Sequence, residues 1–436
     1  MRYTALLLLV TFVVPCRADD ADGFRPLFNG RDLSGWVPVN VAPETFSARD
    51  GMIVSTGKPT GVMRTDRQYE NYVLELEWRH IKPGGNAGLF VWSDALPDIG
   101  VPFTRSFEVQ ILDGQNTANY TSHGDVFGIW GATMVPDRPH PAGWMRCLPS
   151  EHRAKPSPEW NHYRVTCKDG TIKLEVNGKE VSGAHDCVPR KGYLCLEAEG
   201  SECHFRGLRI KELPSSGATP AQTAALDEGF VSLYSGLDLR GWKSDPGHVG
   251  HWQARGSILA YDGKSEAKDR DLWTEKEYGN FVLMADWRLP GKPVSRPRPV
   301  VQPSGDEARD AAGTVVTKAV PYAGDSGILI RGWEKAQVNI TCNTIGSGEL
   351  YGYRVDPAMP PATRTGSIPK VIADAPLGKW NRFVITMKGN RVTVVLNGKT
   401  VISETELPGV PARGPIGLQH HGDPVQFTNL FIRELE

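Results

Sequence analysis

Alternating hydrophobic and polar positions recur along the chain and predict β-strands. From Tyr72 to Trp78, apolar side chains alternate with acidic ones, which is the pattern of a half-buried strand. The same β-rich character appears in Tyr163–Cys167, Ile172–Val176 and Val392–Leu396. Asn-Gly pairs at 177–178 and 397–398 stand directly before another short apolar run, which indicates tight hairpins. Long apolar stripes at helical spacing are absent, so we expect an all-β protein.

The sequence contains one domain twice. The segment from Phe24 to Trp36 recurs as Phe230 to Trp242, and Tyr69–Arg79 recurs as Tyr278–Arg288. Two further pairs are Glu159–Val181 with Lys379–Val401, and the closing segments from Phe205 and from Phe427. Roughly 190 to 210 residues of short strands per copy predict an antiparallel sandwich or jelly roll.

The repeats place the boundaries. We predict a signal peptide at 1–18, domain 1 at 19–213, a linker at 214–226 and domain 2 at 227–436. The linker is small and polar, which is typical of a flexible connection. The segment from Pro290 to Pro321 has no counterpart in the first copy and is interpreted as a long loop inserted between two strands.

The N-terminus reads as an export signal. Arg2 precedes the apolar stretch Ala5–Val14, and Cys16–Ala18 forms a small-x-small cleavage site. The stretch is too short to span a bilayer, and no later segment approaches that length. We therefore expect an exported protein, periplasmic or extracellular, without a membrane span. A buried N-terminal segment and a lipid anchor at Cys16 are the alternatives, although Pro15 fits a lipidation motif poorly.

Charge and cysteine content restrict the partners. The 49 Lys and Arg residues balance 50 Asp and Glu residues, so there is no electrostatic footprint for nucleic acid or an anionic membrane. The cysteines beyond Cys16 include no C-x-x-C pair, so their spacing favours neither a zinc site nor a disulfide framework. We interpret them mainly as core residues with one or two bridges: Cys147, Cys167, Cys187, Cys195, Cys203 and Cys342.

Acidic residues on two predicted strands of domain 1 are the main catalytic candidates. Glu108 and Gln110 share one face of a strand, and Glu197 and Glu199 share one face of another. Such carboxylates suit acid–base work on a sugar or coordination of a hard cation. A solvated strand face is the alternative interpretation of the same pattern.

Domain 2 has neutral groups in the corresponding strands. They are Gln337 and Asn339 in one strand, and Gln419 and His421 in the other. An amide cannot act as a proton-transfer base, so the two copies cannot use equivalent groups. His421 is either a base near neutral pH or a surface or packing residue.

Turns and aromatic residues supply further candidates. Glycine-rich turns at 84–88 and 324–327 place Asn86 or Asp325 near a site. Aromatic rings that can stack on a sugar or fill the core are Trp92, Trp130, Trp144 and Trp333, whereas Trp36 and Trp242 are interpreted as structural plugs. A cofactor is not identified; Ca²⁺ is an open option at Asp94, Asp98, Asp113 or Asp125, although no contiguous ligand loop is present.

Both copies resemble the 3-keto-disaccharide hydrolase family. The motifs are LFNGRDLSGW and LYSGLDLRGW, the NAGLF and DSGILIRG turns, SFEVQILD, the WN segments before VNGK and LNGK, and the closing GPIGLQHHGDPVQFTNL. The resemblance implies a fold of two tandem concanavalin A-like jelly-roll β-sandwich domains. It also implies a carbohydrate substrate, a glycoside oxidised at C3 by a partner oxidoreductase, which is cleaved by acid–base chemistry at C2 and C1.

The resemblance carries individual residues over. Domain 1 has the family's Glu-x-Gln-x-x-Asp as Glu108, Gln110 and Asp113, but departs from Gln-x-His at Glu197 and Glu199. Domain 2 keeps Arg331, Gln419 and His421 and departs at Gln337 and Asn339. We expect catalysis by Glu108, Glu197, Glu199 or His421, with substrate bound by Asn86, Trp92, Gln110, Asp113, Arg331, Gln337, Asn339 and Gln419. A non-catalytic lectin-like protein and a conventional glycosidase are the alternatives.

Overall fold

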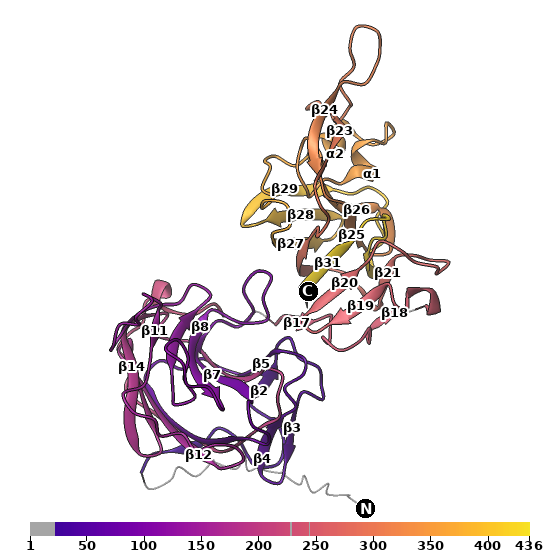
Figure 1. Ribbon diagram of the computed structural model, residues 1–436. Coiled ribbons are helices and arrows are strands. Elements are labelled where there is room, and N and C mark those ends of the chain that lie inside the picture. The colour runs from indigo at the N-terminus through magenta and orange to yellow at the C-terminus, as the bar shows by residue number, and fades with distance from the viewer. Residues whose placement is uncertain (1–21, 227–228, 244) are drawn as a thin grey trace, which may run out of the picture.

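The computed structural model describes residues 22–226, 229–243 and 245–436. It confirms the predicted fold class of two tandem jelly-roll β-sandwich domains, which follow one another along the chain (Figure 1). The predicted signal peptide and Cys16 lie outside the described residues. None of the helices in the described residues has the length and hydropathy needed to cross a lipid bilayer.

Domain 1 consists, in the described residues, of two packed antiparallel sheets. The back sheet is ordered β10 (Thr133–Pro136), β14 (Lys179–Val188), β13 (Thr171–Val176), β12 (Asn161–Lys168), β6 (Tyr72–His80), β16 (Cys203–Glu212), β4 (Met52–Ser55) and β3 (Phe46–Arg49), and β1 (Arg25–Pro26) pairs with β16. The second sheet, here called the site sheet, is ordered β11 (Arg146–Cys147), β9 (Val126–Ile129), β8 (Ser106–Leu112), β7 (Asn86–Ser93), β15 (Tyr193–Ala198), β5 (Gly61–Thr65) and β2 (Trp36–Pro38).

Domain 2 repeats the two-sheet arrangement. Its back sheet is ordered β19 (Trp252–Arg255), β20 (Ile258–Tyr261), β31 (Val425–Glu434), β22 (Phe281–Arg288), β27 (Asn381–Lys388), β28 (Arg391–Leu396) and β29 (Lys399–Glu406), and β17 (Val231–Ser232) pairs with β31. Its site sheet is ordered β18 (Trp242–Lys243), β21 (Leu272–Tyr278), β30 (Gly414–Leu418), β25 (Asp325–Ile330) and β26 (Trp333–Thr341). Each domain therefore has its own core between two sheets.

The predicted strands and hairpins are confirmed. In β12 and β13 buried side chains alternate with partly exposed ones, because one face packs on the opposite sheet. The turn residues Asn177 and Gly178 both have positive φ, 48° and 83°, as a tight hairpin with this twist requires. Asn397 and Gly398 repeat the geometry at 48° and 78°.

The insertion in domain 2 is not the long loop that its composition predicts. Residues Val294–Pro299 (β23) pair with Thr317–Tyr322 (β24), so the segment is an antiparallel hairpin that projects from the domain (Figure 1). Proline is tolerated here because the ribbon has free edges. Short helices in the described residues are α1 (Tyr351–Arg354), α2 (Pro361–Gly366) and two single 3₁₀ turns, Pro220–Gln222 and Pro246–His248.

The cysteines and two tryptophans serve the core. The predicted one or two disulfide bridges are absent: the six cysteines of the described residues are free thiols, and five of them are buried. Cysteine is a small apolar residue that packs well inside a sandwich. Trp36 and Trp242 are buried plugs, as predicted, and their indole N–H groups donate to the carbonyls of Leu27 and Leu233.

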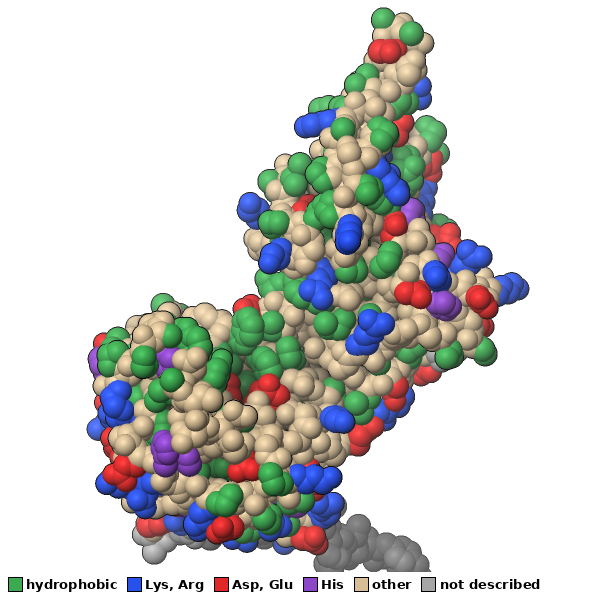
Figure 2. All heavy atoms as spheres, viewed as in Figure 1, with side chains coloured by type: hydrophobic (Ala, Val, Ile, Leu, Met, Phe, Trp, Pro, Cys, Tyr) green, Lys and Arg blue, Asp and Glu red, His purple; other side chains and the backbone are tan. Residues whose placement is uncertain are grey.

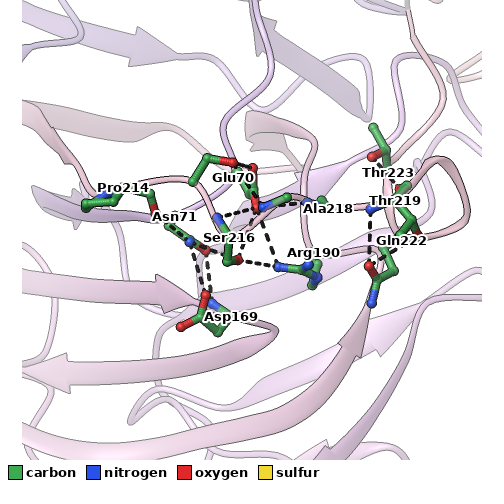
Figure 3. A network of polar contacts seen from close by, with 12 residues as sticks. Glu70, Asn71, Asp169, Arg190, Pro214, Ser216, Ala218, Thr219, Gln222 and Thr223 are labelled. Atoms are coloured by element: carbon green, nitrogen blue, oxygen red, sulfur yellow. Dashed lines mark hydrogen bonds and ion pairs between the residues drawn. The ribbon is translucent and has the colours of Figure 1, made fainter.

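The linker is held against domain 1, although its composition predicts flexibility. The Glu70 carboxylate accepts hydrogen bonds from the backbone N–H groups of Ser216 and Ala218, both at 3.0 Å (Figure 3). Further along, the Ala224 N–H donates to the carbonyl of Lys191 at 2.7 Å. These bonds keep the pKa of Glu70 below its ordinary value, because they stabilise the charged form.

We expect the Glu70→Gln variant to release the linker. An amide offers one acceptor oxygen in place of two and no charge, so backbone donors of the linker lose their partner. Limited proteolysis should then cut within residues 214–226 roughly tenfold faster than in the wild type, since cleavage follows the population of the open form. Glu159→Gln, an exposed carboxylate elsewhere in domain 1, is the matched control. Equal cleavage rates in both variants would contradict this role of Glu70.

Candidate active site

A cavity of about 410 Å³ opens on the outer face of the domain 1 site sheet. Its volume is in the range of small-ligand pockets. The polar lining residues are Asn86, Glu108, Gln110, Arg146, Glu197 and Glu199. The apolar and aromatic ones are Phe103, Leu112, Tyr120, Phe127, Ile129 and Trp130. The cavity therefore combines a carboxylate cluster with an aromatic wall.

The strand pattern brings the carboxylates together. On β8, Val109 and Ile111 are completely buried in the core, which turns Glu108 and Gln110 to the outer face as predicted. β7 lies between β8 and β15, and its Gly88 leaves space above the sheet. A Cβ at Gly88 would lie 2.7 Å from Glu197 Oε2 and 3.0 Å from Glu108 Oε1. The two carboxyl groups thus lie close together above Gly88, where any larger residue would clash with them.

The carboxyl groups are buried, so the solvated strand face is excluded as an interpretation. Glu108 is 7% exposed and Glu197 is 1% exposed. Burial, together with the charge of Glu199, raises the pKa of Glu108 from 4.5 to about 8. Burial also raises the pKa of Glu197 well above its ordinary range, and the charges of Glu108 and Glu199 add to the effect. Both groups therefore hold a proton at neutral pH.

Glu199 differs because it accepts a hydrogen bond. Asn86 Nδ2 donates to Glu199 Oε2, which offsets part of the increase that burial causes in the pKa of Glu199. Gln110 Nε2 in turn donates to Asn86 Oδ1 at 2.7 Å and orients the amide. Glu197 Oε2 has no hydrogen-bond partner within the described part of the chain. The Asn86 hydrogen bond thus favours the charged form of Glu199, whereas burial favours the protonated forms of Glu108 and Glu197.

Arg146 also lines the cavity, and no motif in the sequence points to it. Its guanidinium lies 3.8 Å from the ring centre of Phe127 and 4.3 Å from that of Tyr120. Asp125 Oδ2 is 3.8 Å from Arg146 Nη1, and the positive charge lowers the pKa of Glu108 against the effect of burial. A single arginine outside any motif offers no sequence signal, because the fold alone brings it to the cavity.

Domain 2 has a cavity of about 400 Å³ on its own site sheet. Strand register makes Gln337 and Asn339 the counterparts of Glu108 and Gln110, because Gly88 faces Gln110 and Gly327 faces Asn339. The four predicted residues Gln337, Asn339, Gln419 and His421 line this cavity. Gln337 Nε2 donates to Gln419 Oε1 at 2.6 Å, so an amide pair stands where domain 1 has carboxyl groups.

The charged groups of this second cavity are mostly paired with one another. Asp325 accepts hydrogen bonds from Thr341 Oγ1 at 2.8 Å and from Arg298 Nη2 at 3.2 Å. Glu349 forms a buried ion pair with Arg354. Burial raises the pKa of both Asp325 and Glu349. Arg298 belongs to the inserted hairpin and Arg354 to α1, so neither has a counterpart in the repeat.

Three residues predicted to bind substrate lie outside both cavities. Trp92 is completely buried in the core, and its indole N–H donates to the carbonyl of Glu70 at 2.7 Å. Arg331 directly follows β25, is buried and donates to backbone carbonyls, including that of Gly279 at 2.6 Å. Asp113 accepts the N–H of Gly84 at 3.1 Å and fixes a turn. These positions correct the predictions: all three residues support the fold.

The described part of the chain offers no cluster of side chains for a metal ion. Within residues 22–226, 229–243 and 245–436, no three His, Cys, Asp or Glu side chains are arranged to hold a metal ion. Among the aspartates considered for Ca²⁺, Asp94 pairs with Arg105 at 2.9 Å and Asp125 is bonded to Thr121.

Comparison with known proteins matches both domains to one family. The model of the 3-keto-alpha-glucoside-1,2-lyase-like domain matches residues 23–211 and 229–433. A curated protein of Bacteroides thetaiotaomicron named 3-keto-disaccharide hydrolase is 24% identical over 244 residues, which cover 44% of this chain and 80% of that protein.

Two of the solved structures similar to this chain are named as carbohydrate-related proteins. A candidate glycosyl hydrolase from Parabacteroides distasonis is 23% identical, covers 44% of this chain and 95% of its own, and has a TM-score of 0.35. A carbohydrate-binding module from Bacillus subtilis is 14% identical, covers 41% and 96%, and has a TM-score of 0.30.

Burial of Glu108 makes stability depend on pH. The pKa of its carboxyl is about 8 in the folded state against 4.5 in an exposed chain, so between these values the unfolded chain binds fewer protons. Stability is therefore expected to decrease as the pH rises from 5 to 8. In Glu108→Gln this contribution is absent, and urea unfolding at the two pH values should show a smaller decrease than in the wild type. The control Glu159→Gln should lose as much unfolding free energy between the two pH values as the wild type. An equally large loss in Glu108→Gln would contradict the assigned protonation.

Proposed function

Because the chain belongs to the 3-keto-alpha-glucoside-1,2-lyase-like domain family through both of its domains, we propose that it is a carbohydrate-active hydrolase or lyase that cleaves 3-keto-glycosides in the cavity of domain 1. The observation that carries the proposal is the cluster of Glu108, Glu197 and Glu199, in which two carboxyl groups are almost fully buried and the third accepts a hydrogen bond from Asn86. Titratable groups that share one cleft in different environments are typical of acid–base sites.

The reaction needs a base, an acid and a group that stabilises negative charge. A ketone at C3 acidifies the proton on C2, so a base can remove that proton and form an enolate. The bond from C1 to the leaving oxygen then breaks while an acid protonates that oxygen, and water adds to the resulting double bond in the hydrolytic outcome. Each proton transfer contributes about 10²- to 10⁴-fold in rate.

The cluster offers these roles with different residues. Glu199 is the base, because the Asn86 hydrogen bond supports its charged form. Glu108 is the acid, since its pKa of about 8 leaves it protonated at neutral pH. Arg146 provides a positive charge beside the cavity for the enolate oxygen, in a setting where burial strengthens electrostatic effects. Glu197 holds a second proton next to Glu108 and keeps negative charge from accumulating there.

Replacement of the acid and the base tests the assignment. We expect Glu199→Gln and Glu108→Gln each to lower kcat on a 3-keto-glucoside at least about 10²-fold, because an amide transfers no proton. Glu180→Gln, an exposed carboxylate on β14, is the control with wild-type turnover. The matched unoxidised glucoside should not be cleaved by any of these proteins. Cleavage of that glucoside would instead identify a conventional glycosidase, and full turnover in both variants would refute the site.

For domain 2 we propose sugar binding without cleavage. The amide pair of Gln337 and Gln419 lines a cavity of similar size but supplies hydrogen bonds only. This amide pair is thus suited to recognition, as in a lectin. This proposal stands beside catalysis in domain 1 and does not replace it.

The division of labour predicts opposite effects of variants in the two domains. Gln337→Ala is expected to leave kcat on a small 3-keto-glucoside unchanged and to weaken glucoside binding about tenfold, the loss of roughly one hydrogen bond to a ligand. Calorimetric titration in the Glu108→Gln background measures that binding without turnover. A loss of turnover in Gln337→Ala equal to that of Glu199→Gln would show that domain 2 takes part in the chemistry.

We further propose that the protein is exported and depends on a partner enzyme. The N-terminal pattern of Arg2, the apolar stretch and the small-x-small site supports export. A glycoside carries no ketone at C3 until a hydroxyl there has been oxidised, so an oxidoreductase acting on sugars must supply the substrate.

A further inference from the structure

Domain 2 packs on the same sheet face that carries the domain 1 cavity. On β7, Asn86 lines the cavity, whereas Phe90 is buried in an apolar cluster that includes Phe431 of domain 2. β15 shows the same division, because Glu197 lines the cavity and Cys195 belongs to the cluster. One face of the site sheet is thus open at one end and covered at the other.

The covered end is closed by apolar side chains. The cluster consists of Val39, Val62, Phe90, Ala95, Tyr193, Cys195 and Phe431. Phe230 and Met284 of domain 2 pack against it. Figure 2 shows hydrophobic side chains gathered where the two domains meet, with charged groups spread over the surface beyond them. Such a contact is a stable lid over the sheet, because separating the domains would expose these groups to water.

Hydrogen bonds hold one segment of domain 1 in this contact. The segment from Asp94 to Arg105 connects β7 to β8, and its Gly100 N–H donates to Asp286 Oδ2 at 2.9 Å. Asp286 is completely buried on β22 and also accepts Arg382 Nε at 2.6 Å. Arg382 and Asn429 each donate to a backbone carbonyl of the segment at 2.9 Å. Domain 2 therefore fixes the backbone of this segment.

The fixed segment forms a wall of the cavity. Phe103 lines the cavity and packs edge-on against Phe90, with ring centres 6.3 Å apart. Asn40 Nδ2 donates to the carbonyl of Pro102 at 2.8 Å, so domain 1 holds the segment from the other side. Trp130 lines both this cavity and a crevice of about 450 Å³ between the domains. The shape of the cavity at this end depends on the position of domain 2.

We propose that domain 2 closes one end of the domain 1 cavity, so that the enzyme accepts a terminal 3-keto sugar and excludes an internal unit of a longer chain. The proposal rests on the proposed function of domain 1 and adds the size and position of its substrate. Phe103 is the specificity-determining residue, since its ring occupies the path that a continuing glycan would need. Domain 2 acts as a positioning element for that ring.

The full-length protein and two oxidised substrates test the proposal. One substrate is a small 3-keto-glucoside, and the other is a 1,4-linked glucan oxidised at one internal C3. The wild type should prefer the small substrate by about a hundredfold in kcat/KM, and Phe103→Ala should lower that ratio about tenfold through KM for the glucan. A wild type that cleaves both substrates equally well would overturn the proposal.

A glycine variant separates the domains at one point without removing a charged group. At Gly100, where φ is 74°, an added Cβ would lie 2.2 Å from Trp380 of domain 2, so Gly100→Ala wedges the segment away. Gly51→Ala is the matched control, because its φ is 73° and nothing lies within 4 Å of the added atom. Only the wedge variant should lose substrate preference about tenfold, with kcat on the small substrate retained.

Hydrogen exchange distinguishes a failure of this proposal from a failure of the proposed function. The Gly100 amide should be protected in the wild type and in Gly51→Ala, and should exchange faster in Gly100→Ala. Fast exchange in the wild type would overturn the closed end whatever the activity. Slow exchange together with no cleavage of any 3-keto-glucoside would refute the proposed function alone. An unchanged preference in a wedge variant with fast exchange would refute the role of domain 2 in specificity.

Discussion

Burial of like-charged carboxyl groups on one sheet face is the constraint on which the site of this protein depends. Glu108 and Glu197 are removed from water and meet over Gly88, so they cannot both ionise at neutral pH. Neighbouring groups reduce the cost of burying these carboxyl groups. Asn86 supports the charge on Glu199, and the buried Arg146 offsets part of the negative field. A cost in stability is thus retained where it provides acid and base groups of different proton affinity.

The duplication keeps the frame and changes the site. In domain 1, Asn177 accepts the N–H of His162 and donates to Asn161; in domain 2, Asn397 does the same with Arg382 and Asn381. These bonds fix each hairpin to its neighbouring strand, which explains why the WN and NGK segments recur. Residues on the outer face of the site sheet do not make these hairpin bonds. At corresponding positions there, domain 1 has carboxyl groups and domain 2 has amides.

Domain 2 contributes to the molecule in more than one way. Its back sheet supplies Asp286, Arg382 and Asn429, which hold the segment that carries Phe103 in domain 1. Its own cavity lies on the opposite sheet and is walled by an inserted hairpin that domain 1 lacks. The two faces of domain 2 therefore serve different purposes, one as part of an interface and the other as a separate pocket.

The sequence by itself determined the repeat, the strands and the face on which each strand residue lies, because a period of two depends only on backbone geometry. That reasoning placed Glu108 with Gln110, Glu197 with Glu199, and the four residues of the domain 2 cavity. It could not tell whether a face is covered. Tertiary structure alone decided that the carboxyl groups are buried, that Trp92 and Arg331 are buried away from the cavities, that Arg146 joins the cavity and that the linker is bound to Glu70. The reason is that burial and contact arise from segments far apart in the chain, and a local pattern carries no information about its distant neighbours.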